Sequence, residues 1–546
     1  TDVFTGGFNA EYGGRVSSIM DIKTKDGNKK NFGGKLTANT FGSKLLLEGP
    51  LSKNQKSSFV FSGKTSYLDK SSDIFYKEPL FTFDENGLPY SYTDLYGKIS
   101  LHGNNGSKFN IFGFNFQDLV DYENISKLSW KSNGIGSEFI LIPGNSPVLI
   151  EGNFAYSSYK ISLDEAASPI RESGISGFNM GFDFTYFKPK SKIKYGFDVH
   201  GYATDFLTYN SVNTPITQNE NTSEFSGYIN YQYTSTRLII EPGFRIQKYT
   251  LGLSPEPRLG IKYIVNEKTR LKLASGFYSQ NILSTSSDRD VVNLFSGIIS
   301  SPEEIPTQPN GDEYASKIQK AKHIITGIEF DVNNQIDFQV EAYIKDFNQL
   351  TNINRNMTSD DDDTFIIETG IARGIDALLK YNSKKLYVWL VYSLGQVKRD
   401  DGVREYSPHF DRRHNVNFVT SYKFGKKQDW KFDARWNLGS GFPFTQTQGF
   451  YENITFSDGI NTDYTSTNGD LGIQYAELNN GRLPYYHRLD ISLAKNITFK
   501  NNSKLNITAS VTNAYNRENI FYFNRVKYDR VNQLPLMPSL GMSLTF

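Results

Sequence analysis

The chain has 546 residues and no cysteine, and its 59 Lys and Arg residues nearly balance its 58 Asp and Glu residues. This balance gives no electrostatic reason to expect nucleic acid as a partner, and the missing thiols exclude disulfides and cysteine-based catalysis. The mean hydropathy is −0.48 and no run of 18 apolar residues exists. A helical membrane span is therefore excluded, but a β-barrel is not, because half of each barrel strand faces a polar interior. The 34 Tyr and 41 Phe suit membrane interfaces.

The first 30 residues differ from the rest of the chain. Thr1 is not a natural start, and no signal peptide follows it, so we expect an N-terminal portion to be missing. The glycines of Tyr12-Gly-Gly-Arg15 permit left-handed backbone angles and predict a turn. Residues 1–30 are therefore treated as a segment of their own.

From about residue 33 onward, apolar and polar residues alternate with period two. In residues 430–438, Trp430, Phe432, Ala434, Trp436 and Leu438 share one face, and the residues between them are mostly charged or polar. Residues 337–345 and 504–512 repeat this arrangement. Such alternation predicts β-strands with one apolar and one polar face. We expect the apolar faces of these strands to contact lipid.

The connections between these strands alternate mostly between short and long. Short polar turns and long irregular stretches are expected at the following positions: short at 54–56, 104–106, 143–147, 266–268, 333–334, 425–428 and 501–503, and long at 68–92, 281–318, 349–363, 398–410, 441–483 and 517–537. This pattern is typical of an up-and-down barrel with short periplasmic turns and long outer loops. The strand count from about residue 33 to residue 546 is 22. The predicted fold is all-β, a 22-stranded antiparallel transmembrane barrel whose wide lumen needs a plug.

Three groups of residues are candidate ligand sites. The long loop 441–483 carries Tyr451, Phe456, Tyr464 and Tyr475, which suit stacking and hydrogen bonding to a solute. The run Asp360, Asp361, Asp362 and Asp363 offers hard oxygen ligands for Ca²⁺ but lacks the spacing and the glycine of a calcium loop, so a solvated acidic loop is the preferred interpretation. A strand would place His409 and Asp411 on one face and His414 on the other, which disfavours a metal site there. We therefore expect no metal site and no cofactor.

The chain ends in Pro538-Ser-Leu-Gly-Met-Ser-Leu-Thr-Phe546, with Leu540, Met542, Leu544 and Phe546 on one face. This ending resembles the C-terminal insertion signal of Gram-negative outer-membrane proteins, which implies that Phe546 serves insertion by the barrel assembly machinery. The strand is expected to pair with the first strand, near residues 35–40, because a closed barrel leaves no edge.

Several phrases, taken in order, resemble TonB-dependent outer-membrane receptors, most closely those of the Bacteroidetes. The matching phrases are Ala10-Glu-Tyr-Gly-Gly-Arg15, Phe32-Gly-Gly34, Leu47-Glu-Gly-Pro50, Glu256-Pro-Arg-Leu-Gly260, Phe410-Asp-Arg-Arg-His414, Gly439-Ser-Gly-Phe-Pro-Phe444, Arg488-Leu-Asp-Ile-Ser492 and Val511-Thr-Asn-Ala-Tyr-Asn516. The resemblance implies that residues 1–30 are the end of the plug domain and that residues 31–546 are the barrel. It also implies that Glu11 and Arg15 contact the barrel wall.

The resemblance implies an outer-membrane transporter that imports a scarce solute, such as a siderophore, peptide or oligosaccharide. Its partners would be outer-membrane lipid and a TonB-type energy-coupling protein, which engages an N-terminal segment absent from this chain. The alternative is a receptor-like barrel that serves as a non-transporting structural subunit of a larger outer-membrane complex. An outer-membrane enzyme is disfavoured, because the sequence has no Gly-x-Ser-x-Gly elbow, no His-Glu-x-x-His and no phosphate loop.

Overall fold

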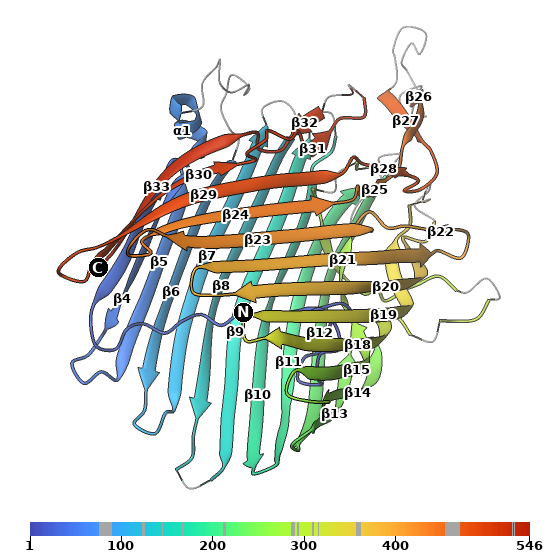
Figure 1. The fold of residues 1–546 in the computed structure, drawn as a ribbon. Coiled ribbons are helices and arrows are strands. Elements are labelled where there is room, and N and C mark those ends of the chain that lie inside the picture. The colour runs from blue at the N-terminus through green and yellow to red at the C-terminus, as the bar shows by residue number, and fades with distance from the viewer. Residues whose placement is uncertain are drawn as a thin grey trace.

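The computed structural model describes the whole chain except residues 76–89, 123–125, 145, 166–167, 211–213, 286–289, 292–293, 308–310, 315, 356, 358–361, 454–469, 527 and 529. The strands form one closed antiparallel barrel with small hairpins beyond one rim (Figure 1). No helix among the described residues is long and apolar enough to cross a membrane.

Twenty-two long strands make up the barrel, as the sequence predicts. In chain order they are β3 (Gly33–Asn39), β4 (Gly42–Pro50), β5 (Ser57–Ser66), β6 (Tyr90–His102), β7 (Lys108–Tyr122), β8 (Ser126–Leu141), β9 (Val148–Glu165), β10 (Arg171–Lys188), β11 (Ser191–Tyr209), β12 (Pro215–Thr234), β13 (Leu238–Tyr249), β14 (Gly252–Ile264), β15 (Thr269–Gln280), β18 (Gln319–Asn333), β19 (Ile336–Ile353), β20 (Phe365–Asn382), β21 (Leu386–Asp400), β23 (His414–Phe424), β24 (Trp430–Gly439), β29 (Tyr486–Thr498), β30 (Lys504–Thr512) and β33 (Met537–Thr545). The fold prediction is confirmed.

The barrel closes where β3 meets β33. Five residue pairs join these strands, from Lys35 opposite Thr545 to Asn39 opposite Gly541. Phe546 extends the pairing, because its backbone amide donates to Gly34 O at 3.0 Å and its carbonyl oxygen accepts from Gly34 N at 3.0 Å. The first and last strands therefore meet as the sequence analysis expected, and the sheet has no free edge at this position.

The alternation of the sequence becomes an alternation of faces. In β33, Leu540 and Met542 are exposed while Ser543 between Met542 and Leu544 is buried. In β24, Phe432 is exposed, and Trp436 on the same face donates from Nε1 to the exposed Tyr515 at 3.2 Å. The outer face is therefore apolar and aromatic, whereas the alternate residues face the lumen.

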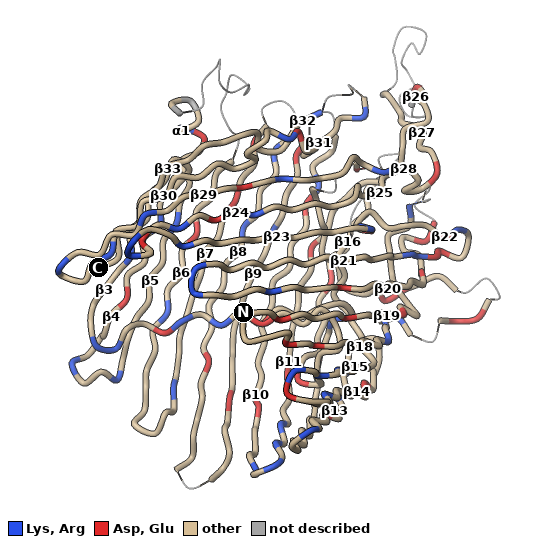
Figure 2. The backbone as a smooth tube through the Cα atoms, in the orientation of Figure 1, with Lys and Arg blue, Asp and Glu red and all other residues tan. Residues whose placement is uncertain are grey.

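The two ends of the barrel carry connections of different length. Short turns join the strands at one end, and Figure 2 shows basic residues there, as at residues 383–385 between β20 and β21. The other end carries longer connections that hold small elements not predicted from the sequence. These are α1 (Leu68–Phe75), β16 (Ile282–Thr285) paired with β17 (Gly297–Ser300), β22 (Glu405–Tyr406) beside β21, β25 (Pro443–Phe444) paired with β28 (Gly481–Arg482), β26 (Thr447–Asn453) paired with β27 (Asp470–Tyr475), and β31 (Ile520–Phe523) paired with β32 (Arg530–Asn532).

The N-terminal segment precedes the first barrel strand and lies against lumen-facing side chains. It carries a short two-stranded sheet of β1 (Asp2–Phe4) and β2 (Ile19–Asp21). Figure 1 shows it as a dark blue trace at the level of β19 and β18, near the N-terminus. Phe8, Ala10 and Val16 of this segment are buried, so the segment is packed against the wall rather than hanging free.

Candidate functional site

Two arginines of the wall hold the turn formed by residues 9–12. Arg258 Nη1 donates to the carbonyl oxygens of the first and last residues of this turn, at 2.6 and 2.5 Å. Arg245 Nη1 donates to the carbonyl oxygens of the two residues between them, at 3.3 and 3.1 Å. Four successive backbone carbonyls are thus bound by two buried guanidiniums, which fixes the turn through its backbone.

Two carboxylates of the wall, one buried and one partly exposed, hold these arginines in place. Glu256 Oε2 accepts from Arg258 Nη2 at 2.5 Å, and Asp198 Oδ2 accepts from Arg245 Nη2 at 3.0 Å. Glu256 is fully buried, so its charge depends on the arginine beside it. The ion pairs and the hydrogen bonds to the turn together compensate the desolvation of these charges.

A glycine lets the turn approach the wall closely. A Cβ added at Gly13 would lie 2.1 Å from Arg245 Nε, and Gly14 has a φ of +67°. A side chain at Gly13 would therefore displace the guanidinium that holds the turn. The Gly-Gly pair quoted in the sequence analysis is explained by this contact and by the positive φ angle.

An aromatic cluster supports the same turn. The ring of Phe8 lies 4.5 Å from the ring of Tyr278, and Tyr278 in turn stacks on His323 at 4.3 Å. His323 Nε2 is 2.9 Å from Val16 O, and Gln280 Oε1 accepts from Val16 N at 3.0 Å. The segment is thus anchored by a small apolar cluster as well as by charges.

Of the two predicted plug–wall residues, Glu11 lies within this turn and Arg15 follows it by three residues. The carboxylate of Glu11 is 2.5 Å from Lys194 Nζ of β11. Arg15 Nη1 donates to Gly14 O at 2.6 Å, and its side chain lies beside Tyr202 and Glu224 of the wall. The structure therefore places Glu11 and Arg15 between the segment and the wall.

Asp26 makes a second contact between the segment and the wall. Its carboxylate is 2.9 Å from Lys98 Nζ and 3.0 Å from Lys108 Nζ. Partial burial alone would raise the pKa of Asp26, but hydrogen bonds from the two lysines outweigh it and lower the pKa below 3.8. The carboxylate is therefore ionised at neutral pH, and it ties the end of the segment to β6 and β7.

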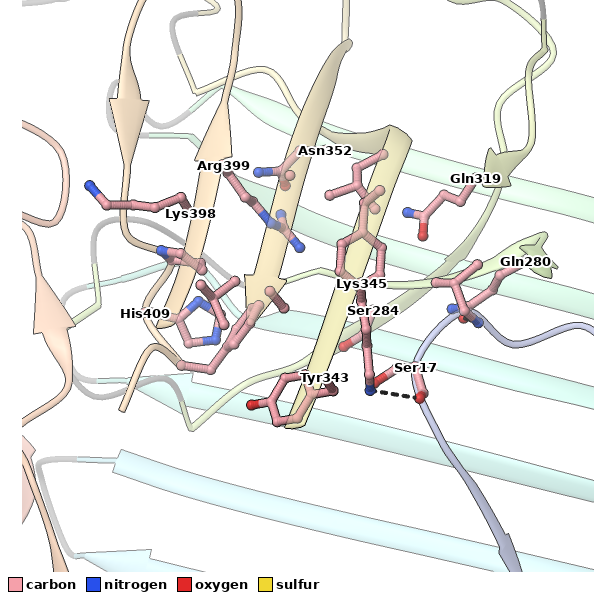
Figure 3. Close-up of a pocket in the computed structure, with 18 of the residues that line it drawn as sticks. Ser17, Gln280, Ser284, Gln319, Tyr343, Lys345, Asn352, Lys398, Arg399 and His409 are labelled. Carbon is pink, nitrogen blue, oxygen red and sulfur yellow. Dashed lines mark hydrogen bonds between the residues drawn. The ribbon is translucent and has the colours of Figure 1, made fainter. Parts of the chain in front are cut away.

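A cavity of about 620 Å³ lies between the segment and the wall (Figure 3). Its polar lining residues include Ser17 from the segment, Tyr343 and Lys345 from β19, and Arg399 from β21. Glu341 and Asp376 also line it. The cavity thus presents cations, carboxylates and aromatic rings to a bound molecule.

Lys345 belongs both to the cavity and to the contact with the segment. Its ammonium donates to Thr5 O at 2.5 Å and to Ser17 O at 3.2 Å, the second contact being the dashed line of Figure 3. Both acceptors are neutral carbonyls, so these bonds orient the ammonium without neutralising its charge. An anion entering the cavity would compete with the segment for this lysine.

The outer part of the cavity is built on a buried carboxylate, Glu368. It accepts from Arg355 Nη2 at 2.6 Å, from Tyr406 Oη at 2.7 Å and from Arg399 Nη1 at 3.3 Å. Arg355 Nη1 also donates to Asp401 at 2.7 Å. This network fixes the guanidinium of Arg399 at the cavity wall. The sequence patterns did not predict this role of Arg399.

The residues of the His409–His414 cluster take part in separate contacts. The strand β23 begins at His414, whose Nδ1 is 2.9 Å from Tyr392 Oη. Asp411 is buried and accepts from Arg482 Nη2 at 2.5 Å. Burial, reinforced by the charge of Arg399, lowers the pKa of His409 to about 4, so this side chain is neutral at neutral pH.

Two residues of the acidic run, Asp360 and Asp361, lie outside the described residues. Asp362 and Asp363 are described, and Asp363 O accepts from Asn354 Nδ2 at 2.7 Å. Within the described part of the chain, no group of three or more His, Asp or Glu side chains is arranged to hold a metal ion.

Two of the four predicted aromatic residues of the loop 441–483, Tyr451 and Tyr475, lie on the hairpin of β26 and β27. Tyr451 is exposed, and its ring covers Gly472 on the opposite strand. The ring of Tyr475 lies 5.2 Å from the guanidinium of Arg525. Phe456 and Tyr464 lie outside the described residues.

Comparison with solved structures identifies the architecture. The structure matches BauA, the ferric preacinetobactin receptor of Acinetobacter baumannii, with a TM-score of 0.66 and 10% identity over 98% of this chain and 83% of that chain. It matches the FrpB iron transporter of Neisseria meningitidis with a TM-score of 0.69 and 12% identity over 100% and 86%. The chain has the fold of TonB-dependent receptor barrels.

A third match is a mutant of the ferric enterobactin receptor PfeA of Pseudomonas aeruginosa, with a TM-score of 0.64 and 11% identity over 100% of this chain and 84% of that chain. No family model and no curated protein matches the chain. These neighbours are receptors and transporters rather than enzymes.

Proposed function

We propose that this chain is an outer-membrane transporter of the TonB-dependent type. In this proposal residues 1–30 are the end of the plug, and residues 31–546 form the barrel. The fold supports it, because a 22-stranded barrel has a wide lumen that must be closed to keep the membrane sealed. The order of the sequence motifs supports a receptor of the Bacteroidetes type.

The observation that carries the proposal is the way in which the wall holds the segment. Arg245 and Arg258 bind four backbone carbonyls of residues 9–12. Such hydrogen bonds resist thermal motion but can be broken by a pull and remade afterwards, and no covalent bond has to change. A coupling protein that draws on the plug would therefore open a path through the lumen. The energy comes from the inner membrane, so the barrel itself needs no nucleotide.

The solute that we propose is an anionic chelate of iron. Lys345 and Arg399 line the cavity with cationic side chains, and Lys345 is oriented by neutral carbonyls. The structural neighbours are named as receptors or transporters of iron or of ferric chelates. The outer-loop residues Tyr451, Phe456, Tyr464 and Tyr475 are proposed to make the first contact, since aromatic rings suit chelates of this kind.

Uptake of radiolabelled ferric citrate and ferric catecholate chelates, measured in cells that carry the protein as encoded, tests this function. We expect accumulation of at least one chelate, and we expect deletion of the coupling protein to abolish it. The Lys345→Met variant should take up less, whereas Lys345→Arg, which keeps the charge, should retain most of the uptake. Uptake that survives loss of the coupling protein would contradict the proposal.

A result without any uptake would favour a different function. If the protein instead co-purified in fixed ratio with other outer-membrane proteins, it would be a structural subunit of a complex. One transport assay and one purification thus distinguish the transporter from the structural subunit.

A further inference from the structure

The outer face of the barrel carries a hollow over β18 to β21. It measures about 590 Å³, and its walls are Ile324, Ile344, Ile375 and Leu394. Three of the four, Ile324, Ile344 and Ile375, are about half exposed, which places the hollow on the face opposite the lumenal cavity. In a membrane this face contacts acyl chains, so the hollow is an apolar recess open to lipid.

The floor of the hollow is low because its residues are small. Thr326, Ala342, Gly374 and Gly395 come from four neighbouring strands. Thr326 and Ala342 are the outward-facing residues of this floor, and Gly374 and Gly395 contribute only their backbone to it. An acyl chain lying here would bury apolar surface on three sides rather than one.

Two guanidiniums line the same hollow. Arg373 alternates with the exposed Ile371 and Ile375 and so points to the outer face of β20. It donates from Nε and Nη2 to Gln396 Oε1, at 3.0 and 2.8 Å. The acceptor is a neutral amide, so this contact orients the guanidinium without neutralising it.

The second guanidinium is that of Arg413. Its Nη2 lies 3.7 Å from Asp411 Oδ2, beyond hydrogen-bond length. That carboxylate is already held by Arg482 Nη2 at 2.5 Å, and its other oxygen accepts from Val397 N at 2.8 Å. Asp411 therefore belongs mainly to the loop, and Arg413 keeps donors for another anion.

The position of the hollow along the strands fits a lipid headgroup. Arg373 pairs with Ile344 of β19 and Gln396 of β21. Two residues further toward the long connections, on the same outer face, lie Lys322 and Lys398. At this level of the outer face, apolar side chains are thus followed by charged side chains. The headgroups of a bilayer would lie at the same level.

We propose that this hollow binds a phosphorylated lipid of the surrounding membrane, with the phosphate on Arg373 and Arg413 and an acyl chain over Thr326 and Ala342. Arginine forks match the oxygens of a phosphate, and the apolar walls match the chain. The site lies on the outer face and uses none of the lumenal residues. It rests on the proposed function only in requiring that the barrel spans a membrane.

The test is to count lipids retained by the purified full chain with native mass spectrometry. The protein in detergent is titrated with phosphatidic acid and, separately, with diacylglycerol of the same chains. We expect phosphatidic acid to be retained at concentrations about tenfold lower than diacylglycerol, because only phosphatidic acid carries a phosphate that the guanidiniums can bind. Equal retention of the two lipids by the unaltered protein would overturn the proposal without any variant being made.

The variants locate the site. Arg373→Gln combined with Arg413→Gln should abolish the preference for phosphatidic acid. Lys131→Gln removes an exposed cation from β8, outside the hollow, and should leave the preference unchanged. If Lys131→Gln lost the preference for phosphatidic acid to a similar extent, any outward-facing cation would be enough to bind the lipid. That result would overturn the proposed site. Inorganic phosphate should not compete at equal concentration, because it lacks the chain, and effective competition would point to free phosphate as the ligand.

Neither outcome depends on transport. Chelate uptake by the Arg373→Gln and Arg413→Gln variant should equal that of the unaltered protein, because both residues lie outside the lumen. Failure of the lipid site therefore leaves the transport proposal standing, and failure of transport leaves the lipid site standing.

Discussion

The ammonium of Lys194 lies 2.5 Å from the carboxylate of Glu11 and joins the N-terminal segment to β11. Two carboxylates of the wall, Glu151 at 3.8 Å and Asp183 at 3.9 Å, face the same ammonium. The ammonium of Lys194, which is largely buried, thus interacts with three carboxylates. The two residues of the ion pair are therefore not equivalent, and their variants should differ.

Glu11→Gln should weaken the docking of the segment only slightly, by about 1 kcal/mol, because Lys194 keeps two carboxylates. Lys194→Met should cost about 3 kcal/mol or more, because it leaves three carboxylates facing one another. Hydrogen exchange of the backbone amides of residues 8–16 measures the free energy of local opening. Lys160→Met, which removes an exposed ion pair with Glu172, is the control and should change nothing there. Equal effects of the first two variants would contradict this account.

Arg258→Met should destabilise the barrel and the segment together, by about 3–5 kcal/mol, since it leaves Glu256 buried and unpaired. Adding Glu256→Gln to that variant should recover a substantial part of the loss, because the uncompensated charge is then gone. Thermal unfolding of the three variants gives the coupling between the two residues. If the double variant is less stable than Arg258→Met, the buried carboxylate of Glu256 is not the main cause of the stability lost in Arg258→Met.

The contact of Asp26 should depend on pH. Its pKa is lowered in the folded protein, so its contribution to docking is fully present above 3.8 and is lost as the pH falls through the lowered value. The chain has no cysteine, so Asn28→Cys can carry a single spin label near this contact. We expect the label to gain mobility as the pH falls below about 4, and expect Asp26→Asn to show the mobile spectrum at every pH. A label that stays immobile in Asp26→Asn would show that other contacts hold this part of the segment.

Deletion of Phe546 should lower the amount of protein in the outer membrane far more than it lowers stability. The deletion removes two backbone hydrogen bonds to Gly34 and about 2 kcal/mol of apolar burial, which is small beside the other contacts of the barrel. Quantitative blotting of membrane fractions gives the yield, and resistance to heat before electrophoresis reports the folded state. Phe546→Trp keeps an aromatic end and is the control. A normal yield of the deletion would refute the role in insertion.

Much of the fold could be predicted from residue periodicity. Alternation such as that of residues 430–438 is produced directly by a sheet with lipid on one side and water on the other, so the strands and their number follow from it. The small hairpins in the long connections, such as β26 with β27, were not predicted. Their residues carry no sustained alternation, because a two-stranded ribbon beyond the barrel has no buried face to enforce one.

The contact residues of the wall were harder to predict. Glu11 and Arg15 could be named because they lie in a distinctive phrase. Arg245, Arg258 and Lys345 look like any charged lumenal position, since the alternation that places them in the lumen says nothing about what they meet there. One signal was present in the sequence: Glu256 and Arg258 stand two apart in β14 and so share a face.

The seam between β3 and β33 sets the order in which the barrel can be completed. It is joined by five residue pairs, whereas β11 and β12 are joined by nineteen, from Ser191 opposite Tyr233 to Tyr209 opposite Pro215. The shortest of these junctions unites the first and the last barrel strands, so the cylinder remains an open sheet until β33 is in place. Because this seam has the fewest backbone pairs between neighbouring long strands, we expect the barrel to separate there first when it unfolds.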